Sequence, residues 1–450
     1  MTEVPPPAAG DIATPFKKIL HWLGLAPQEF RAVAWSFATF FAVLCAYYII
    51  RPLRDEMGVA VGADGRERLF FIVFLVMLGA VPLFGWLVSR FPRKHVAPLV
   101  YAFFIANLGL FWLLLSTWKA NALLASAFFV WVSVFNLFVV SLFWIVMADI
   151  WSTADAKRNY GFIAAGGSAG AFSGPYITQS IVHHVGVANL LLVSAAFLAV
   201  AMTGLLALRK AVGQVLPAAQ DGRASDGILS GAERVFKSPY LFQIALWIFV
   251  TNLISTFFYL EQSRIIGDAI EESADRVQLF ARIDWTVSSL TILAQVFVTG
   301  WVLRRFSVGL CMAALPLSAL IGLLALAISP SLAVIVAIII AERAIGFGIS
   351  NPAARVLYTV VAPEDKYKAQ NFIDTVVFRG GDAASGWLFN SAVKAVGLAT
   401  PAVALLTLPF AVGWLTLSLS LGRKQEALAA KNAPERVPGA SSQGHSIHPA

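Results

Sequence analysis

The heptapeptide Gly85-Trp-Leu-Val-Ser-Arg-Phe91 recurs as Gly300-Trp-Val-Leu-Arg-Arg-Phe306 in the second part of the chain. Each copy ends an apolar segment, and about twenty apolar residues allow a helix to cross the hydrocarbon core of a membrane. Gly166-Gly167 and Gly380-Gly381 form a second matching pair, and each follows a short charged loop. The chain is therefore expected to consist of two related halves.

Apolar segments of spanning length occur along most of the 450 residues. They lie at 32–50, 69–89, 96–118, 120–148, 159–182, 185–208, 238–260, 285–303, 369–391 and 395–422, with two more in the long run at 306–341. Ser329-Pro330-Ser331 divides that run, and its second span continues toward Tyr358. The pattern predicts an all-α polytopic membrane protein, in which twelve transmembrane helices form two six-helix halves related by a pseudo-twofold axis.

The composition independently excludes a soluble protein, because apolar residues make up 58% of the chain and charged residues only 13%. Soluble domains carry roughly 25% charged residues. We interpret the net charge of +8 as basic cytoplasmic loops in a lipid bilayer and not as a nucleic-acid surface. Cys45 and Cys311 stand alone in apolar runs, and the sequence shows no metal-binding or phosphate-binding motif. Neither a cofactor nor an enzyme activity is predicted.

Five regions follow from the pattern of spans. They are a cytoplasmic N-terminal tail at 1–30 with an interfacial helix at 16–24, a six-helix bundle at 31–208, a linker at 209–237, a second bundle at 238–422 and a disordered tail at 423–450. Most Lys and Arg residues of the loops lie on the side that holds both termini. The positive-inside rule places that side in the cytoplasm. We expect a monomer in the inner membrane of a bacterium.

Gly166, Gly170 and Gly174 lie four residues apart on one face of the helix expected at 159–182, and Pro175 follows them. Missing side chains let a second helix approach closely, and proline removes a backbone donor and permits a bend. A packing seam is the simplest interpretation. Gly161, Gly170 and Gly174-Pro175, separated by eight and three residues, have a spacing that resembles the antiporter motif of the major facilitator superfamily, which implies a role in gating.

The loop at 85–94 resembles that superfamily's loop between its second and third helices. It keeps the glycine and the basic residues of that loop, at Gly85 and Arg90 among others. The resemblance implies the major facilitator fold and a gating or packing role for these two residues.

Four longer stretches resemble a narrower family, the non-mitochondrial ATP/ADP antiporters of bacteria and plastids. They are Tyr48-Ile-Ile-Arg-Pro-Leu-Arg-Asp55, Phe143-Trp-Ile-Val-Met-Ala-Asp-Ile150 with Asp155-Ala-Lys-Arg-Asn-Tyr160, and residues 252–261 and 351–374. By this resemblance, Arg54 falls where the family has a lysine for nucleotide phosphates. Asp149 and Glu261 fall near its acidic helix positions. The resemblance implies exchange of nucleotides across the membrane.

Ionisable side chains inside the predicted spans are costly in a bilayer and usually face a cavity or a partner. Several guanidinium groups around one cavity suit a solute that carries phosphates. The predicted substrate-binding residues are Tyr48, Arg51, Arg54, Asp149, Glu261, Arg282, Arg355, Tyr358 and Arg379. Structural ion pairs are the alternative for each arginine, and Arg379 is three residues from Asp382, so the two can pair within one helix.

Two transport functions remain open from the sequence, beside a membrane enzyme or receptor-like scaffold, for which no nucleophile–base or metal constellation is visible in the spans. The chain is expected to exchange a nucleotide or another phosphorylated small-molecule anion by alternating access. Alternatively, it is a proton-coupled transporter of a different small solute, with Asp149 and Glu261 as proton carriers. Nearly equal sequence offsets predict two gates, Arg54–Glu261 on the outer side and Asp149–Arg355 on the cytoplasmic side.

Overall fold

The computed structural model describes residues 30–117, 121–151, 153–212, 228–396 and 399–432. Within these ranges, ten helices are long and apolar enough to cross a membrane. The more polar helix α6 (Thr153–Val185) and the helical segment from Pro363 to Val396 correspond to the two remaining predicted spans. The twelve predicted spans are therefore all present as helices.

The first half of the chain forms six helices. They are α2 (Phe30–Ala60), α3 (Ala63–Arg90), α4 (Arg93–Thr117), α5 (Ala122–Ile150), α6 (Thr153–Val185) and α7 (Leu190–Val212). Some helices begin at a capping side chain. The Asn121 side chain, for example, accepts a hydrogen bond from the backbone N–H of Leu124 and so caps α5.

The second half contains more segments, because three of its spans include short π-helical stretches. Its elements are α8 (Ile228–Lys237), α9 (Pro239–Ala269), α10 (Ser273–Leu293), η1 (Ala294–Thr299), α11 (Gly300–Arg305), α12 (Val308–Ile328), α13 (Leu332–Ile345), η2 (Gly346–Ser350), α14 (Asn351–Val356), η3 (Leu357–Val360), α15 (Pro363–Phe372), η4 (Ile373–Val377), α16 (Phe378–Val396) and α17 (Thr400–Asn432). Helices α10, η1 and α11 follow one another without a break, as do α13, η2 and α14.

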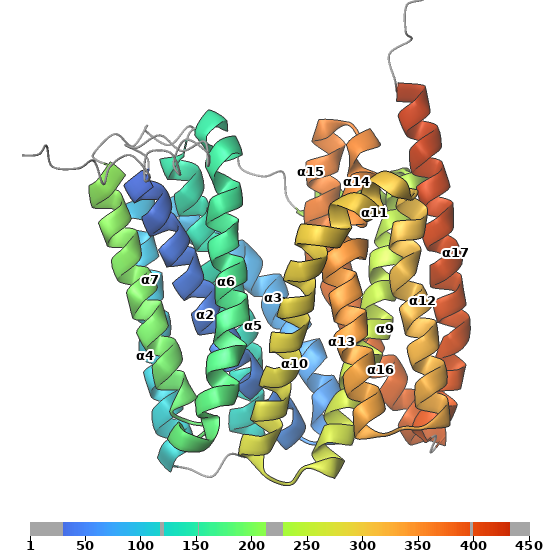
Figure 1. Ribbon diagram of the computed structural model, residues 1–450, viewed down its shortest axis with the longest axis horizontal. Helices are drawn as coiled ribbons and strands as arrows, with labels where there is room; N and C mark the ends of the chain where they lie inside the picture. Colours follow the sequence, from blue (N-terminus) through green and yellow to red (C-terminus); the bar gives the residue numbers. More distant parts are fainter. Residues whose placement is uncertain (1–29, 118–120, 152, 213–227, 397–398, 433–450) are drawn as a thin grey trace, which may run out of the picture.

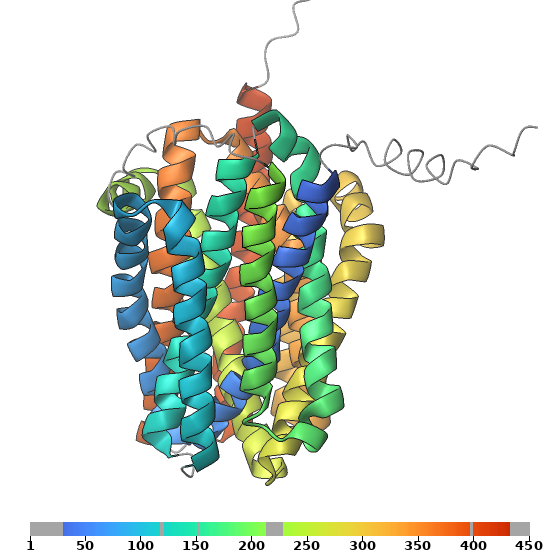
Figure 2. The ribbon, with the colours of Figure 1, turned by 90° about the vertical axis from the view of Figure 1, so that its left-hand side faces the viewer.

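The helices form two groups side by side, one for each half of the chain (Figure 1). A view at right angles shows the helices of both groups running along a common direction (Figure 2). Each group has its own large cluster of buried apolar side chains. We call the end of the molecule that holds Phe30 and Asn432 the terminal end, and the opposite end, with Gly62 and Gly186, the Gly62 end.

The glycine stripe of α6 lies directly against α2. A Cβ atom added to Gly170 would lie 2.3 Å from the carbonyl oxygen of Phe41, and one on Gly166 would lie 2.5 Å from that of Phe37. Gly174 lies similarly close to the backbone of α2 at Cys45. Only glycine permits this approach, which brings the central part of α2 into the interior of the molecule.

Several segment boundaries differ from the predicted ones. Helix α17 continues to Asn432, so residues 423–432 are helical and not part of a disordered tail. The linker at 209–237 contains the last turn of α7 and the whole of α8. Helix α8 packs closely on α15, where Gly231 faces the carbonyl oxygen of Lys368. The interfacial helix expected at 16–24 and the remainder of both tails lie outside the described residues.

Candidate functional site

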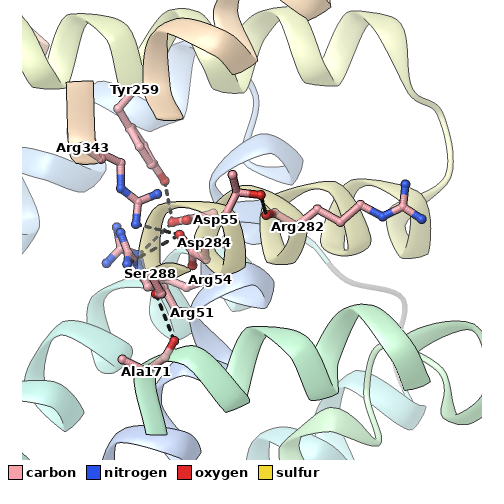
Figure 3. Close-up of polar contacts among 10 residues, drawn as sticks. Arg51, Arg54, Asp55, Ala171, Tyr259, Arg282, Asp284, Ser288 and Arg343 are labelled. Carbon is pink, nitrogen blue, oxygen red and sulfur yellow. Dashed lines mark hydrogen bonds and ion pairs between the residues drawn. The ribbon is translucent and has the colours of Figure 1, made fainter. Parts of the chain in front are cut away.

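Asp284 of α10 is the centre of an ion-pair cluster between the two halves (Figure 3). Its side chain is only 1% exposed. A guanidinium nitrogen of Arg343, from α13, lies 2.7 Å from Asp284 Oδ1, and one of Arg51, from α2, lies 3.6 Å from the same oxygen. Two arginines from opposite halves thus share one carboxylate, and the cluster keeps an excess of positive charge.

The second carboxylate oxygen of Asp284 is buried and has no hydrogen-bond partner in the described structure. Charged groups in a low-dielectric interior are expensive unless their bonding capacity is filled. The three-residue cluster of Arg51, Asp284 and Arg343 is therefore an incomplete arrangement. It can rearrange when a stronger anion reaches the two guanidinium groups.

Arg54 lies one turn beyond Arg51 on α2 and faces a different set of neighbours. Its guanidinium group lies over the ring of Phe129, 4.6 Å from the ring centre, and its Nε atom is 3.3 Å from Asp55 Oδ1. The Tyr259 hydroxyl of α9 donates a hydrogen bond of 3.0 Å to the same Asp55 oxygen. Arg54 thus belongs to a contact between α2 and α9.

A cavity of about 320 Å³ extends from this cluster toward the terminal end. It lies between α2 and α6 of the first half and α10, α13 and α14 of the second, and Ser288 bridges the halves by donating a hydrogen bond to the carbonyl oxygen of Ala171. Its polar lining residues are Tyr48, Ser168, Ser288, Thr291, Gln295, Arg343 and Asn351. Small-molecule sites in proteins measure about 300–1,000 Å³, so the cavity can hold a small organic solute.

The two halves are joined by strong polar contacts nearer the Gly62 end. Arg276 of α10 holds Glu56 of α2 with two nitrogens, at 2.6 and 2.8 Å, and both side chains are largely buried. His183 lies 3.4 Å from Asp275. The Gln278 amide donates to the carbonyl oxygen of Gln179. These contacts close the Gly62 end, and the ribbons spread apart toward the terminal end (Figure 1).

The predicted outer gate between Arg54 and Glu261 does not form in this conformation. Glu261 is bonded to Arg264 at 2.8 Å, one turn away on α9, and accepts a hydrogen bond of 2.8 Å from the Thr400 hydroxyl. A partner on the same helix needs no movement of the halves, and equal sequence offsets carry no information on which way each side chain points. The ion pair that joins the halves near the Gly62 end is Glu56–Arg276, and not the predicted Arg54–Glu261.

The predicted inner gate between Asp149 and Arg355 is also absent. Arg355 pairs with Asp374 at 3.0 Å, and both side chains are exposed. With Tyr358 they line a separate pocket of about 140 Å³ inside the second half. Asp149 lies near the end of α5.

The remaining predicted residues lie outside the central cluster. Arg282 is exposed and points away from Asp284, since residues two apart on a helix face nearly opposite directions (Figure 3). Arg379 lies 3.5 Å from Asp382, the pairing expected within one helix. A Cβ on Gly85 would meet open space, and Arg90 is exposed.

Asp284 and Arg343 are not among the predicted substrate-binding residues, although Arg343 lines the cavity and Asp284 is its ion-pair partner. Both are charges inside apolar spans, which is the signal that identifies the other arginines. Glu56 and Arg276 escape the prediction because they lie near the ends of spans, where charges are common. Their burial becomes visible only when the halves are assembled.

A bundle of twelve spanning helices in two halves, with a polar cavity between them, defines a multi-pass membrane transporter. The chain matches the family model of the Major Facilitator Superfamily over residues 32–386. The chain belongs to this superfamily, which places it among transporters and not among enzymes.

Solved structures of other transporters have the same fold. A peptide transporter of the POT family in an auto-inhibited state aligns with a TM-score of 0.61 at 13% identity, over 93% of this chain and 99% of that one. The nucleoside transporter NupG, in a variant with a single substitution, aligns with a TM-score of 0.56 at 14% identity, over 89% and 99%. A bacterial homologue of the human lysosomal transporter Spinster aligns with a TM-score of 0.52 at 12% identity, over 90% and 96%. No curated protein matches the chain by sequence.

Proposed function

We propose that this transporter is a secondary active exchanger of a nucleotide or another phosphorylated anion. One observation carries the proposal: Arg51 and Arg343, from opposite halves, meet on a single carboxylate, and Arg343 lines the cavity. A phosphate group offers several oxygens to both guanidinium groups and competes with Asp284 for them. Substrate bound in this way would join the two halves through its own charge.

The nucleotide is favoured over other phosphorylated anions by two features. The stretch around Arg54 resembles the ATP/ADP antiporters, and Tyr48 lines the cavity together with Arg343. An aromatic ring close to cations can stack on a base while the arginines hold the phosphates. Arg54, which is half-buried against Phe129, then contributes positive potential and not direct contact.

The proposed cycle is alternating access of this cavity in a bacterial inner membrane, by a monomer with both termini in the cytoplasm. Basic residues concentrate in loops on the side of the termini. In that orientation the Gly62 end, where polar contacts join the halves, faces outward, and the terminal end faces the cytoplasm.

Thermal unfolding of the purified protein with ATP, ADP, glucose 6-phosphate, inorganic phosphate and adenosine tests this function. A ligand at about 100 times its dissociation constant stabilises the folded state by roughly 2.7 kcal/mol. We expect stabilisation by nucleotides or another phosphorylated compound and none by adenosine, which lacks phosphate. Stabilisation by uncharged solutes alone would contradict the proposal.

A proton-coupled transporter of a different solute is the second candidate. The observation that favours it is Glu342 of α13, a buried carboxyl group that accepts a hydrogen bond from a hydroxyl and not from a guanidinium. Asp149 and Glu261 are the proton carriers expected from the sequence. Glu261 is less suited to carry a proton, because it forms an ion pair with Arg264.

A further inference from the structure

Buried acidic side chains in the described part of this chain follow a pattern with one exception. Asp55, Glu56, Glu261, Asp284 and Glu342 are at most 7% exposed. The first four each have an arginine partner: Arg54 at 3.3 Å, Arg276 at 2.6 Å, Arg264 at 2.8 Å and Arg343 at 2.7 Å, respectively. Glu342 has no such partner among the described residues and instead accepts a hydrogen bond from the Ser255 hydroxyl.

The environment of Glu342 suits a neutral carboxylic acid better than a carboxylate. A buried charge without a cation is strongly disfavoured, all the more within a membrane. A proton on the carboxyl removes the charge and leaves an acceptor oxygen for Ser255. We propose that Glu342 is the site of the proton that this transporter couples to its substrate.

The position of Glu342 gives a physical route for that coupling. Its neighbour Arg343 holds Asp284 at the end of the cavity, while Glu342 faces α9 through Ser255. The two side chains share one helix, so a movement of α13 that accompanies anion binding at Arg343 also moves Glu342. The π-helical segment η2 (Gly346–Ser350) follows within a turn, and such segments are frequent at functional sites.

The balance of charge sets the direction of the coupling. A proton from water adds to the Glu342 carboxylate and forms an O–H bond, which leaves Arg343 free to bind Asp284 or a substrate anion. When Glu342 loses that proton, its negative charge, one residue away on the same helix, lowers the positive potential at Arg343 and repels the anion. Proton and anion therefore bind together, so that exchange of anions carries a proton along with each anion. This step rests on the proposed function only in requiring an anion at Arg343.

Ionisable groups on the neighbouring helices either have partners other than Glu342 or are exposed. On α9, Tyr259 bonds Asp55 and Glu261 bonds Arg264. The groups of α10 are distributed similarly: Asp275 faces His183, Arg276 holds Glu56, Arg282 is exposed and Asp284 binds the two arginines. Helix α12 contributes the buried thiol of Cys311, which contacts the carbonyl oxygen of Val302. Arg343 is thus the cation that responds to the charge of Glu342.

Helix α9 carries further polar side chains on the face that includes Ser255. Thr251, Ser255 and Tyr259 are spaced four residues apart and therefore lie along one face of the helix. Thr251 lines the pocket of about 140 Å³, Ser255 bonds Glu342, and Tyr259 bonds Asp55 where the halves meet. Ser255, and with it Glu342, therefore lies between the pocket at Thr251 and the contact between the halves at Tyr259.

Infrared difference spectra of the full-length protein in phospholipid vesicles, recorded as the pH is raised without any substrate, test the protonation directly. We expect the wild type to lose the carbonyl-stretch band of a neutral carboxylic acid, and Glu342→Gln to lack that band. Ser255→Ala should keep the band at a higher frequency, because the carboxyl loses a hydrogen bond. A titrating band unchanged in Glu342→Gln, or no such band in the wild type, would overturn the proposal.

A second measurement tests whether the proton controls conformation. Ser168→Cys, in a background with Cys45 and Cys311 replaced by alanine, reports access to the cavity by its rate of reaction with a membrane-impermeant maleimide. The rate, corrected for the pH dependence of a free thiol, should change with pH in the wild-type background and be independent of pH with Glu342→Gln. Equal pH dependence in both would show that Glu342 is only structural. Neither experiment uses a nucleotide, so a failure of the nucleotide assignment leaves both results interpretable.

Discussion

Two guanidinium groups share one carboxylate at the centre of this transporter, and their unequal distances indicate which contact is dominant. Arg343 lies 2.7 Å from Asp284 and Arg51 lies 3.6 Å from it. A buried ion pair offsets its desolvation only with close geometry and filled hydrogen bonds. Arg51 is therefore the weaker partner and the one that a substrate anion can recruit more easily.

Asp284→Asn tests whether Asp284 acts as an internal competitor for the substrate. Removing the carboxylate should tighten the binding of a phosphorylated ligand, because both arginines become available. The same change should lower the free energy of unfolding by about 3–5 kcal/mol, since it leaves buried cations without a partner. Calorimetric titration and thermal unfolding measure the two effects. Weaker ligand binding would mean that Asp284 contacts the substrate itself.

Agreement between sequence and structure is best at the level of whole elements. Length and hydropathy place ten of the twelve predicted spans directly, because a bilayer demands a fixed length of apolar helix, and the other two are helices of more polar sequence. Hydropathy does not identify the polar ends of α2 and α9 as parts of these helices, although those ends carry Glu56 and Glu261. The π-helical segments η1, η2 and η4 have no counterpart in the hydrophobic pattern.

Partner choice is the least predictable feature of the site. Arg379 and Asp382 pair as expected, since i,i+3 spacing on one helix determines their distance. Arg54 and Glu261 are on different helices, and their contact depends on the rotation of each helix about its axis. In spans that are apolar on all sides, the hydropathy pattern does not determine which face of the helix points to the interior.

Gly170→Leu tests the close contact between α2 and α6. Its Cβ would lie 2.3 Å from the Phe41 carbonyl oxygen, a backbone atom that cannot turn away. We expect a loss of about 1–3 kcal/mol or more in the free energy of unfolding, the range for overpacking, together with loss of transport.

Gly161→Leu is the matched control for this substitution. Gly161 belongs to the same helix, and a Cβ there would meet nothing within 4 Å. Thermal unfolding and uptake into vesicles should therefore stay near wild-type values. Equal behaviour of the two leucine variants would show that the effect comes from leucine in α6 and not from the contact with α2.

At the scale of the whole molecule, contacts between the halves concentrate on one side of the cavity. The Glu56–Arg276 pair closes the Gly62 end, with Asp55–Tyr259 deeper inside. Alternating access requires these contacts to break while others form near the terminal end. Only a contact with different energies in the two states can bias the equilibrium between them.

Glu56→Gln should shift the population toward molecules open at the Gly62 end. A differential energy of about 1.4 kcal/mol changes the ratio of the two states tenfold. Gln179→Cys, placed where the halves meet, should react faster with the impermeant maleimide, and Ser168→Cys in the cavity should react more slowly. Glu272→Gln, an exposed residue of the same end, is the control and should leave both rates unchanged.

A double-mutant cycle separates the ion pair itself from other effects at this end of the molecule. Glu56→Gln leaves the Arg276 guanidinium without its carboxylate, although Arg276 still donates to the carbonyl oxygens of Ile270 and Glu271. Arg276→Gln leaves a buried carboxylate without a cation, so it should open the Gly62 end further than Glu56→Gln does. The double variant has neither unpaired charge, and residues in direct contact are not additive. We therefore expect its change in the labelling rate at Gln179→Cys to be smaller than the sum of the two single changes. Strict additivity would show that Glu56 and Arg276 act on the equilibrium separately, and the closing role would then belong to Asp55 and Tyr259.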